Sequence, residues 1–274
     1  MSSEINSLSN LKKYGLLLGT VLFDILLVYG IGHYAYGGWH KTIEAVYNPR
    51  SHFWIAYIFI AILTLIKSDV RDDLPLFIAA IILGFWGEWW GTSQGVWSYY
   101  GKQTPPIYII FFWGIGLLTV YHLHLLTSRL SRKLLPKEKI PGTPILLLAM
   151  ALLLLAGFVL TWKGIVRVDW LKYLDIHFIL AGIVTAFLLI HNFDAHETFS
   201  IFLSGTLLGG IYEYAGTAIG GWTYITGQGI PLVIAPLWGI ACVAMIKLGF
   251  LIKHGVIKLI GVLIPQISSK PSSI

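Results

Sequence analysis

Two glutamates, Glu88 and Glu213, stand inside apolar, aromatic stretches of similar sequence. The first stretch reads "GEWWGTSQGVWSYYGKQTPP" and the second reads "IYEYAGTAIGGWTYITGQGIP". A carboxyl group within a membrane span is costly and marks a candidate functional site. Removed from water, a carboxyl group favours its neutral form, which can donate a proton to a carbon–carbon double bond. Nearby aromatic faces would stabilise the resulting carbocation, while the second carboxylate or a histidine could deliver water or remove a proton.

The candidate site residues divide into two groups. The catalytic candidates are Glu88, Glu213, His52 and His177. The substrate-binding candidates are the aromatic residues Trp97, Tyr99, Trp113, Trp222, Tyr224 and Trp238. Structural interpretations stay open for all of them: the glutamates could hold a loop in place, the histidines could pair at helix ends, and the aromatic residues could form an interfacial belt.

The composition is that of an all-α integral membrane protein. Hydrophobic residues make up 56% of the chain, charged residues make up 12%, and the mean hydropathy is +0.75, which excludes an ordinary soluble domain. About 20 apolar residues form a membrane-spanning helix. Eight such spans are predicted, at about 14–34, 53–68, 74–92, 107–126, 144–162, 176–192, 199–219 and 231–252. We expect the first span to be a retained helix rather than a signal peptide. A single cysteine, Cys242, predicts neither a disulfide nor a cysteine metal site.

The positive charge of the chain is best explained by membrane topology. The net charge is +6, but the basic residues are spread over loop ends, so a nucleic-acid partner is not expected. An even number of spans places both termini on one side, together with most of the Lys and Arg residues. The positive-inside bias makes that side cytoplasmic, so we expect a cell-membrane protein with cytoplasmic termini and outward-facing aromatic loops.

The chain contains an internal repeat of 125 residues. A gapless shift superposes uncommon residues, among them His52 on His177, Asp69 on Asp194, Gly84 on Gly209, Glu88 on Glu213, Trp97 on Trp222, Tyr99 on Tyr224 and Trp113 on Trp238. We predict a first four-span repeat at 1–130, a cytoplasmic linker at 131–143 and a second four-span repeat at 144–274. Because each repeat has an even number of spans, the two run in parallel and are related by a pseudo-twofold axis along the membrane normal.

The depth of each residue along its helix decides which residues can meet. At 1.5 Å per residue, His52 and Asp69 lie about 25 Å apart, at opposite membrane faces. Glu88 lies near the outer end of its span, on the level of His52 and Trp113. We therefore expect the four catalytic candidates to approach a common cavity. The loops that carry Trp97 with Tyr99 and Trp222 with Tyr224 should cover this cavity.

Acidic turns mark the cytoplasmic ends of two spans. They contain Asp69, Asp72 and Asp73 in the first repeat, and Asp194, His196 and Glu197 in the second. Helix capping is the favoured interpretation, with a divalent metal site as the alternative. Our prediction includes no metal and no cofactor.

The pattern E-x-x-G-T-x-x-G-x-W-x-Y, followed by a proline and a further tryptophan, resembles that of a family of carotenoid-biosynthesis membrane proteins. This family includes bisanhydrobacterioruberin hydratase and carotenoid 1,2-hydratase, and there is a fainter likeness to membrane-integral lycopene cyclases. The resemblance covers 84–113 and 209–238. It implies acid-catalysed hydration or cyclisation of a polyene without a redox cofactor, with Glu88 and Glu213 as acid and base. The chain lacks the Gly-Phe-Gly-type stretch of the hydratases and the paired glutamate of the cyclases.

The expected function is that of a membrane enzyme acting on a carotenoid or other lipophilic polyisoprenoid, with membrane lipids around it. Two other classes stay open, a proton-coupled transporter and a structural subunit of a larger membrane complex. An enzyme predicts a long apolar cavity that opens towards lipid. The sequence also leaves open an assembly of identical chains.

Overall fold

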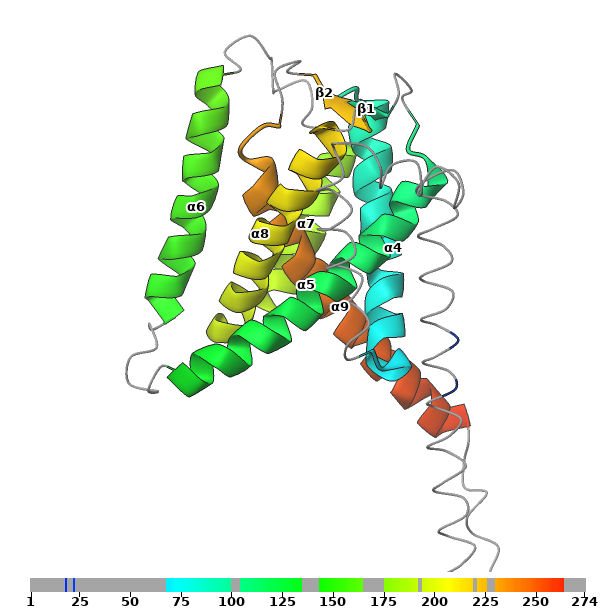
Figure 1. Cartoon of the computed structure of the whole chain (residues 1–274). Coiled ribbons are helices and arrows are strands. Elements are labelled where there is room, and N and C mark those ends of the chain that lie inside the picture. Colours follow the sequence, from blue (N-terminus) through cyan, green and yellow to red (C-terminus); the bar gives the residue numbers. More distant parts are fainter. Residues whose placement is uncertain are drawn as a thin grey trace, which may run out of the picture.

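The structure, a computed structural model, describes residues 68–99, 104–134, 143–164, 175–191, 194–218, 221–225 and 230–263, together with Leu18 and Leu22. Most of these residues are helical. The helices are α4 (Val70–Ser93), α5 (Ile107–Leu134), α6 (Thr143–Gly164), α7 (Ile176–Ile190), α8 (Ala195–Ala218) and α9 (Ile234–Leu263). Two short strands are present, β1 (Trp97–Tyr99) and β2 (Trp222–Tyr224). Figure 1 shows the helices as an elongated bundle with both strands at one end.

Three helices contain a stretch long and apolar enough to cross a membrane, at Val70–Ser93, Ile109–Leu130 and Ile234–Val256. Shorter apolar stretches occur in α6 and α7. The six described helices coincide with the last six predicted spans, whereas the first two predicted spans lie outside the described residues apart from Leu18, Leu22 and the end of the second. The described part of the chain is thus mostly helical and includes three candidate membrane-crossing helices, as expected of an integral membrane protein.

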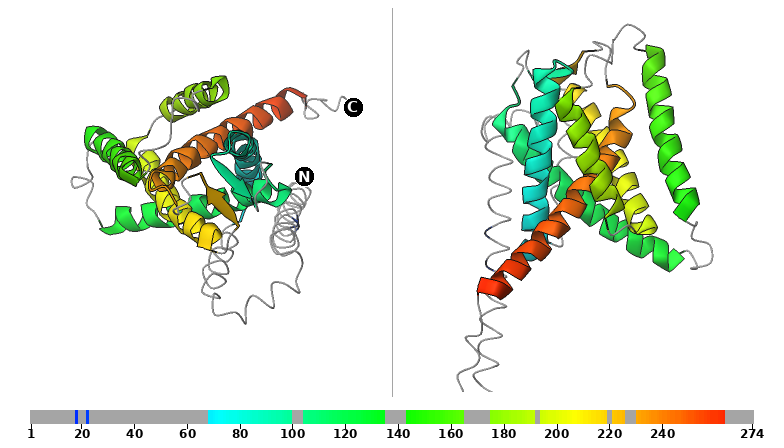
Figure 2. Two further views of the ribbon diagram at one scale, coloured as in Figure 1. Left: turned by 90° about the horizontal axis from the view of Figure 1, so that it is seen from above. Right: turned by 180° about the vertical axis from the view of Figure 1, so that it is seen from behind.

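The core lies where α4, α5, α8 and α9 pack together. Leu76 of α4, Leu117 of α5, Phe202 of α8 and Val243 of α9 belong to one buried cluster, and each is at most 1% exposed. Helix α8 packs along α9, and α4 packs on both α5 and α9. Both side views show α5 and α9 crossing, with their lower ends pointing away from each other (Figures 1 and 2).

The two strands form an antiparallel pair that the all-α prediction did not include. Ser98 lies opposite Thr223, and these residues are 125 positions apart. The flanking pairs are Trp97 with Tyr224 and Tyr99 with Trp222. The 125-residue shift therefore exchanges the two strands and keeps the same three residue pairs. A twofold axis between two strands would produce this pattern.

The end of α4 is a glycine turn that sends the chain back over the helix. The N–H of Val96 donates to the carbonyl of Gly91 at 2.9 Å, and the N–H of Gly95 donates to that of Thr92 at 3.1 Å. Gly95 has φ +71°, the left-handed conformation in which glycine carries no steric penalty. The N–H of Gly221 repeats the first bond, to the carbonyl of Gly216 at 2.8 Å. Each turn leads directly into a strand.

Glycines also let two tryptophans approach the helix backbones. A Cβ on Gly84 would overlap the side chain of Trp113, and a Cβ on Gly209 would overlap that of Trp238. A Cβ on Gly87, one turn further along α4, would meet nothing within 4 Å. The space above Gly84 is thus part of the packing of α4 against α5.

Gly84→Ala is expected to destabilise the protein, because the new methyl group must displace the half-buried Trp113 indole. Overpacking of this kind typically costs about 1–3 kcal/mol. Gly87→Ala is the matched control and should leave stability unchanged or raise it by up to about 1 kcal/mol, the helix-propensity gain of alanine. Unfolding in detergent micelles measures both. Equal stability of the two variants would contradict the close packing at Gly84.

Candidate functional site

Glu88 is held by three aromatic hydrogen-bond donors. Its Oε2 accepts from Trp97 Nε1 at 2.9 Å and from the Tyr99 hydroxyl at 2.8 Å. Its Oε1 accepts from Trp113 Nε1 at 2.9 Å. The side chain is 5% exposed. We call this group of four residues the Glu88 cage.

Glu213 is held in the same way by the residues 125 positions later. Its Oε2 accepts from Trp222 Nε1 at 2.9 Å and from the Tyr224 hydroxyl at 2.5 Å. Its Oε1 accepts from Trp238 Nε1 at 2.7 Å. Glu213 is 6% exposed. Donors, acceptor atoms and burial of this Glu213 cage match those of the Glu88 cage.

Aromatic contacts join the two cages. The indoles of Trp113 and Trp238 stack with their centroids 4.1 Å apart and their planes 13° from parallel. Across the strand pair, the rings of Tyr99 and Trp222 are 5.7 Å apart. The rings of Trp97 and Tyr224 are 6.2 Å apart. The structure thus brings together eight of the ten predicted site residues, the two glutamates and all six aromatic residues.

The motif has a structural explanation at almost every position. The glutamate accepts the hydrogen bonds of the cage. The glycine three residues later makes room for the first tryptophan, since a Cβ on Gly91 or Gly216 would overlap the Trp97 or Trp222 ring. The hydroxyl of Thr92 donates to the Glu88 carbonyl at 2.7 Å, and that of Thr217 to the Glu213 carbonyl at 2.7 Å. The pattern encodes a cage for a buried carboxyl group.

The cages determine what the carboxyl groups can do chemically. The donors are neutral indole and phenol groups, so they do not neutralise the charge of an ionised glutamate. They do provide hydrogen bonds for most of the lone pairs of its two oxygens. Preorganised donors of this kind stabilise the negative charge that remains after an acid has given up its proton. Oε1 of each glutamate accepts from only one cage donor, which leaves it an acceptor position for a proton.

The two predicted histidines do not join the cages within the described part of the chain. His177 lies in the first turn of α7, where its ring meets that of Trp89 edge-on at 4.9 Å. Trp89 is the neighbour of Glu88 in sequence but is not one of its donors. His52 lies outside the described residues. The prediction of a common site for all four catalytic candidates is thus supported for the glutamates alone.

Asp175 connects the beginning of α7 to the end of α4. Its Oδ1 accepts from Phe178 N at 2.8 Å and from Trp90 Nε1 at 3.1 Å, and its Oδ2 accepts from Gln94 Nε2 at 2.9 Å. The hydrogen bond from the Phe178 backbone is the main cause of a pKa below the usual aspartate value. Sequence analysis missed this contact because the residues 125 positions from Asp175, Trp90 and Gln94 are of other types, so the repeat gives no signal.

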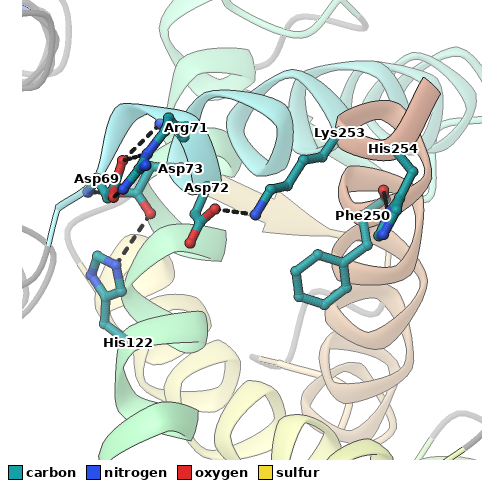
Figure 3. A network of polar contacts seen from close by, with 8 residues as sticks. All are labelled: Asp69, Arg71, Asp72, Asp73, His122, Phe250, Lys253 and His254. Carbon is teal, nitrogen blue, oxygen red and sulfur yellow. Dashed lines mark hydrogen bonds and ion pairs between the residues drawn. The ribbon is translucent and has the colours of Figure 1, made fainter. Parts of the chain in front are cut away.

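The acidic turns at the opposite end of the bundle act mainly as caps and ion pairs. Figure 3 shows the first of the two turns. The Asp69 carboxylate accepts from Arg71 N at 3.0 Å and pairs with its guanidinium at 2.6 Å, which lowers the pKa of Asp69. Asp194 accepts from Glu197 N at 2.8 Å. The capping prediction is confirmed for Asp69 and Asp194, and also for Asp73, whose Oδ2 accepts from the backbone N–H of Asp69 at 2.9 Å.

Asp73 and Asp72 make longer-range contacts that the capping interpretation did not include. Asp73 is 1% exposed and lies 3.3 Å from His122 Nε2 of α5, while Asp72 pairs with Lys253 of α9. The opposite nitrogen of the buried His122 ring has no hydrogen-bond partner among the described residues. Among the residues that the structure describes, no group of three or more His, Cys, Asp or Glu side chains could hold a metal ion, so the metal alternative gains no support there.

The fold and the site define a mostly helical protein with apolar helices able to cross a membrane and with two caged carboxyl groups. Comparison of the chain with models of known protein families, with curated proteins and with solved structures finds no significant match. The family resemblance of the motif therefore stays an expectation.

Glu88→Gln should destabilise the protein, because the amide NH2 cannot accept a hydrogen bond and one of the three buried or half-buried donors loses its partner. An unsatisfied buried donor costs about 1–3 kcal/mol. Trp113→Phe removes one donor, so its cost should be smaller in the Glu88→Gln background than in the wild type. A double-mutant cycle of unfolding free energies in detergent measures this coupling. Equal costs of Trp113→Phe in both backgrounds would show that the indole does not bind this carboxyl group.

Proposed function

We propose that this protein is a membrane-embedded enzyme that acts on a carotenoid or other polyisoprenoid, with Glu88 and Glu213 as the acid–base pair. The observation that carries the proposal is the meeting of two buried carboxyl groups with six aromatic side chains at one end of an apolar bundle. Carboxyl groups and aromatic faces are what protonation of an alkene in lipid requires.

The fold proposal that accompanies this function is an eight-span bundle made of two four-span repeats. The repeats comprise 1–130 and 144–274, with 131–143 as the linker, a pseudo-twofold axis along the membrane normal, and cytoplasmic termini. Its support is that the cages, the helix-end turns and the glycine contacts recur at a spacing of 125 residues. The strand pair centred on Ser98 and Thr223 fits such an axis.

In the proposed reaction, the neutral carboxyl group of one glutamate donates its proton to one carbon of a double bond. The π electrons form the new C–H bond, and the neighbouring carbon becomes a cation. Water adds to this carbon while the other glutamate, as carboxylate, accepts the proton that the water loses. The net change is addition of one water, and return of the proton to the first glutamate resets the site. If a second double bond attacks the cation instead, loss of a proton gives a ring of unchanged mass.

The cage donors have a defined part in this reaction. When the acid loses its proton, three hydrogen bonds already point at the oxygens on which the charge develops, so no reorganisation is needed. The aromatic rings that carry these donors lie beside the carboxyl group, where their faces would attract a cation formed on the substrate. The same side chains can thus stabilise both the anion and the cation.

A structural role for the two glutamates is the competing interpretation. The observation that favours it is that each carboxylate already accepts three hydrogen bonds from its own repeat. In that case the cages would fix the loops over the bundle, as a transporter or a subunit of a larger complex could also require.

The experiment is a mass-resolved pigment profile of a bacterial host that makes a linear carotenoid and expresses the full chain. The wild type should yield a product heavier by one water, or an isomer if a ring closes. Glu88→Gln should abolish the product, because an amide cannot give and recover a proton. Trp113→Phe is the matched comparison: it also removes one hydrogen bond of the Glu88 cage but keeps the carboxyl group, so it should lower product formation without abolishing it.

Each possible result supports or rejects one interpretation. Product formation by a folded Glu88→Gln variant would reject the acid–base role. Equal loss in Glu88→Gln and Trp113→Phe, at equal protein level, would favour the structural role. An unchanged pigment profile with well-expressed wild-type protein would reject a carotenoid as the substrate.

A further inference from the structure

The last turns of α5 carry two leucines and two basic residues on one helix face. Leu126, Arg129, Leu130 and Lys133 are spaced by three and four residues, so they share a side of the helix. Together they line an open hollow of about 450 Å³. The membrane-crossing stretch of α5 ends at Leu130. The leucines therefore belong to its last turns, and Lys133 lies just beyond it.

The positive charge of this face is not balanced by the described part of the protein. At the same end of the bundle, Arg71 pairs with Asp69, and Lys253 pairs with Asp72. None of the ion pairs formed by described residues includes Arg129 or Lys133, both of which are exposed. The α5 end also points away from α9, which carries Lys253 (Figure 1). Arg129 and Lys133 thus form no ion pair with a carboxylate of the described residues.

We propose that this face binds one anionic phospholipid. The phosphate lies against the Arg129 guanidinium and the Lys133 ammonium, and an acyl chain lies along Leu126 and Leu130. Basic residues at the membrane surface attract anionic headgroups, and a guanidinium matches phosphate oxygens in a bidentate geometry. This inference depends on membrane insertion of α5 and not on the proposed reaction.

The two leucines favour a lipid over a soluble anion as the ligand of this face. Leu126 is 52% exposed and Leu130 is 53% exposed, so both have apolar surface free to contact an acyl chain. A free phosphate would use the two cations alone and gain nothing from the leucines. Along the helix, Leu126 comes first and Lys133 comes last, which fits a lipid whose headgroup lies at the end of α5.

The second repeat supplies a matched control. The positions 125 residues after Arg129 and Lys133 are His254 and Lys258, both exposed on α9. Leu126 corresponds to Leu251, but Leu130 corresponds to Gly255, so only part of the apolar face is repeated. His254→Gln with Lys258→Gln removes basic side chains from the equivalent helix end but leaves the proposed lipid site intact.

The test is lipid binding to the delipidated full chain in detergent, followed by native mass spectrometry with phosphatidylglycerol and phosphatidylcholine. The wild type should bind one phosphatidylglycerol in preference to phosphatidylcholine. The Arg129→Gln, Lys133→Gln double variant should bind phosphatidylglycerol roughly thirtyfold more weakly, the effect expected from loss of two basic side chains near a membrane surface. The His254→Gln, Lys258→Gln control should stay within about twofold of the wild type.

Three results would overturn the proposal. One is equal affinity of the wild type and the Arg129→Gln, Lys133→Gln variant for phosphatidylglycerol. Another is equal affinity of the wild type for the two lipids. The third is displacement of phosphatidylglycerol by equimolar inorganic phosphate, because this would identify a soluble-anion site. Leu130→Asn adds a check on the apolar half: it should weaken phosphatidylglycerol binding while both cations stay in place.

Discussion

A carboxyl group removed from water must receive hydrogen bonds from the protein, and here each one receives them from aromatic side chains. Indole N–H and phenol O–H groups combine a polar end with a large apolar body, so they satisfy Glu88 and Glu213 without bringing further charge into the bundle. A lysine or arginine in the same place would need its own desolvation. The cages are thus a solution for acidic groups that stay buried at the end of apolar helices.

This requirement shapes the backbone around each glutamate. Two donors follow within 11 residues, so the helix must end directly after the carboxyl group and the chain must turn back over it. The left-handed Gly95 makes that turn in the first cage. The third donor comes from the next helix, which can approach closely because Gly84 and Gly209 leave space for Trp113 and Trp238. The two strands then pair with each other, and the two cages become one aromatic layer.

Sequence analysis could predict most of this site because its parts lie within one motif. The positions of the glutamates, tryptophans and tyrosines follow from the 125-residue shift, and so do the helix ends near Gly91 and Gly216. The contacts between the repeats could not be predicted in this way. Pairing of β1 with β2, stacking of Trp113 on Trp238, and the hydrogen bonds of Asp175 join residues far apart in the chain, and no local pattern reports which distant segments meet.

The helices and their caps illustrate the same limit. Apolar length was enough to place the six described helices, and acidic residues at helix starts were enough to predict the capping by Asp69 and Asp194. The buried pair of Asp73 with His122 was missed, since an aspartate at a helix start looks like a cap until its partner 49 residues away is known. The expectation that His177 joins the glutamates rested on helical depth alone, and depth does not fix which way a side chain faces. The prediction for His52 stays a prediction, because His52 lies outside the described residues.

The central claim is that the two cages are held together across the strand pair, and a disulfide between Ser98→Cys and Thr223→Cys tests it most directly. The side-chain oxygens of Ser98 and Thr223 are 3.2 Å apart and exposed, while the native Cys242 is buried and should not react. Mild oxidation of the folded protein in membranes should form an intrachain crosslink in the double variant and in neither single variant. Free thiols at both positions after oxidation, or crosslinks only between chains, would contradict the joined arrangement of the two cages.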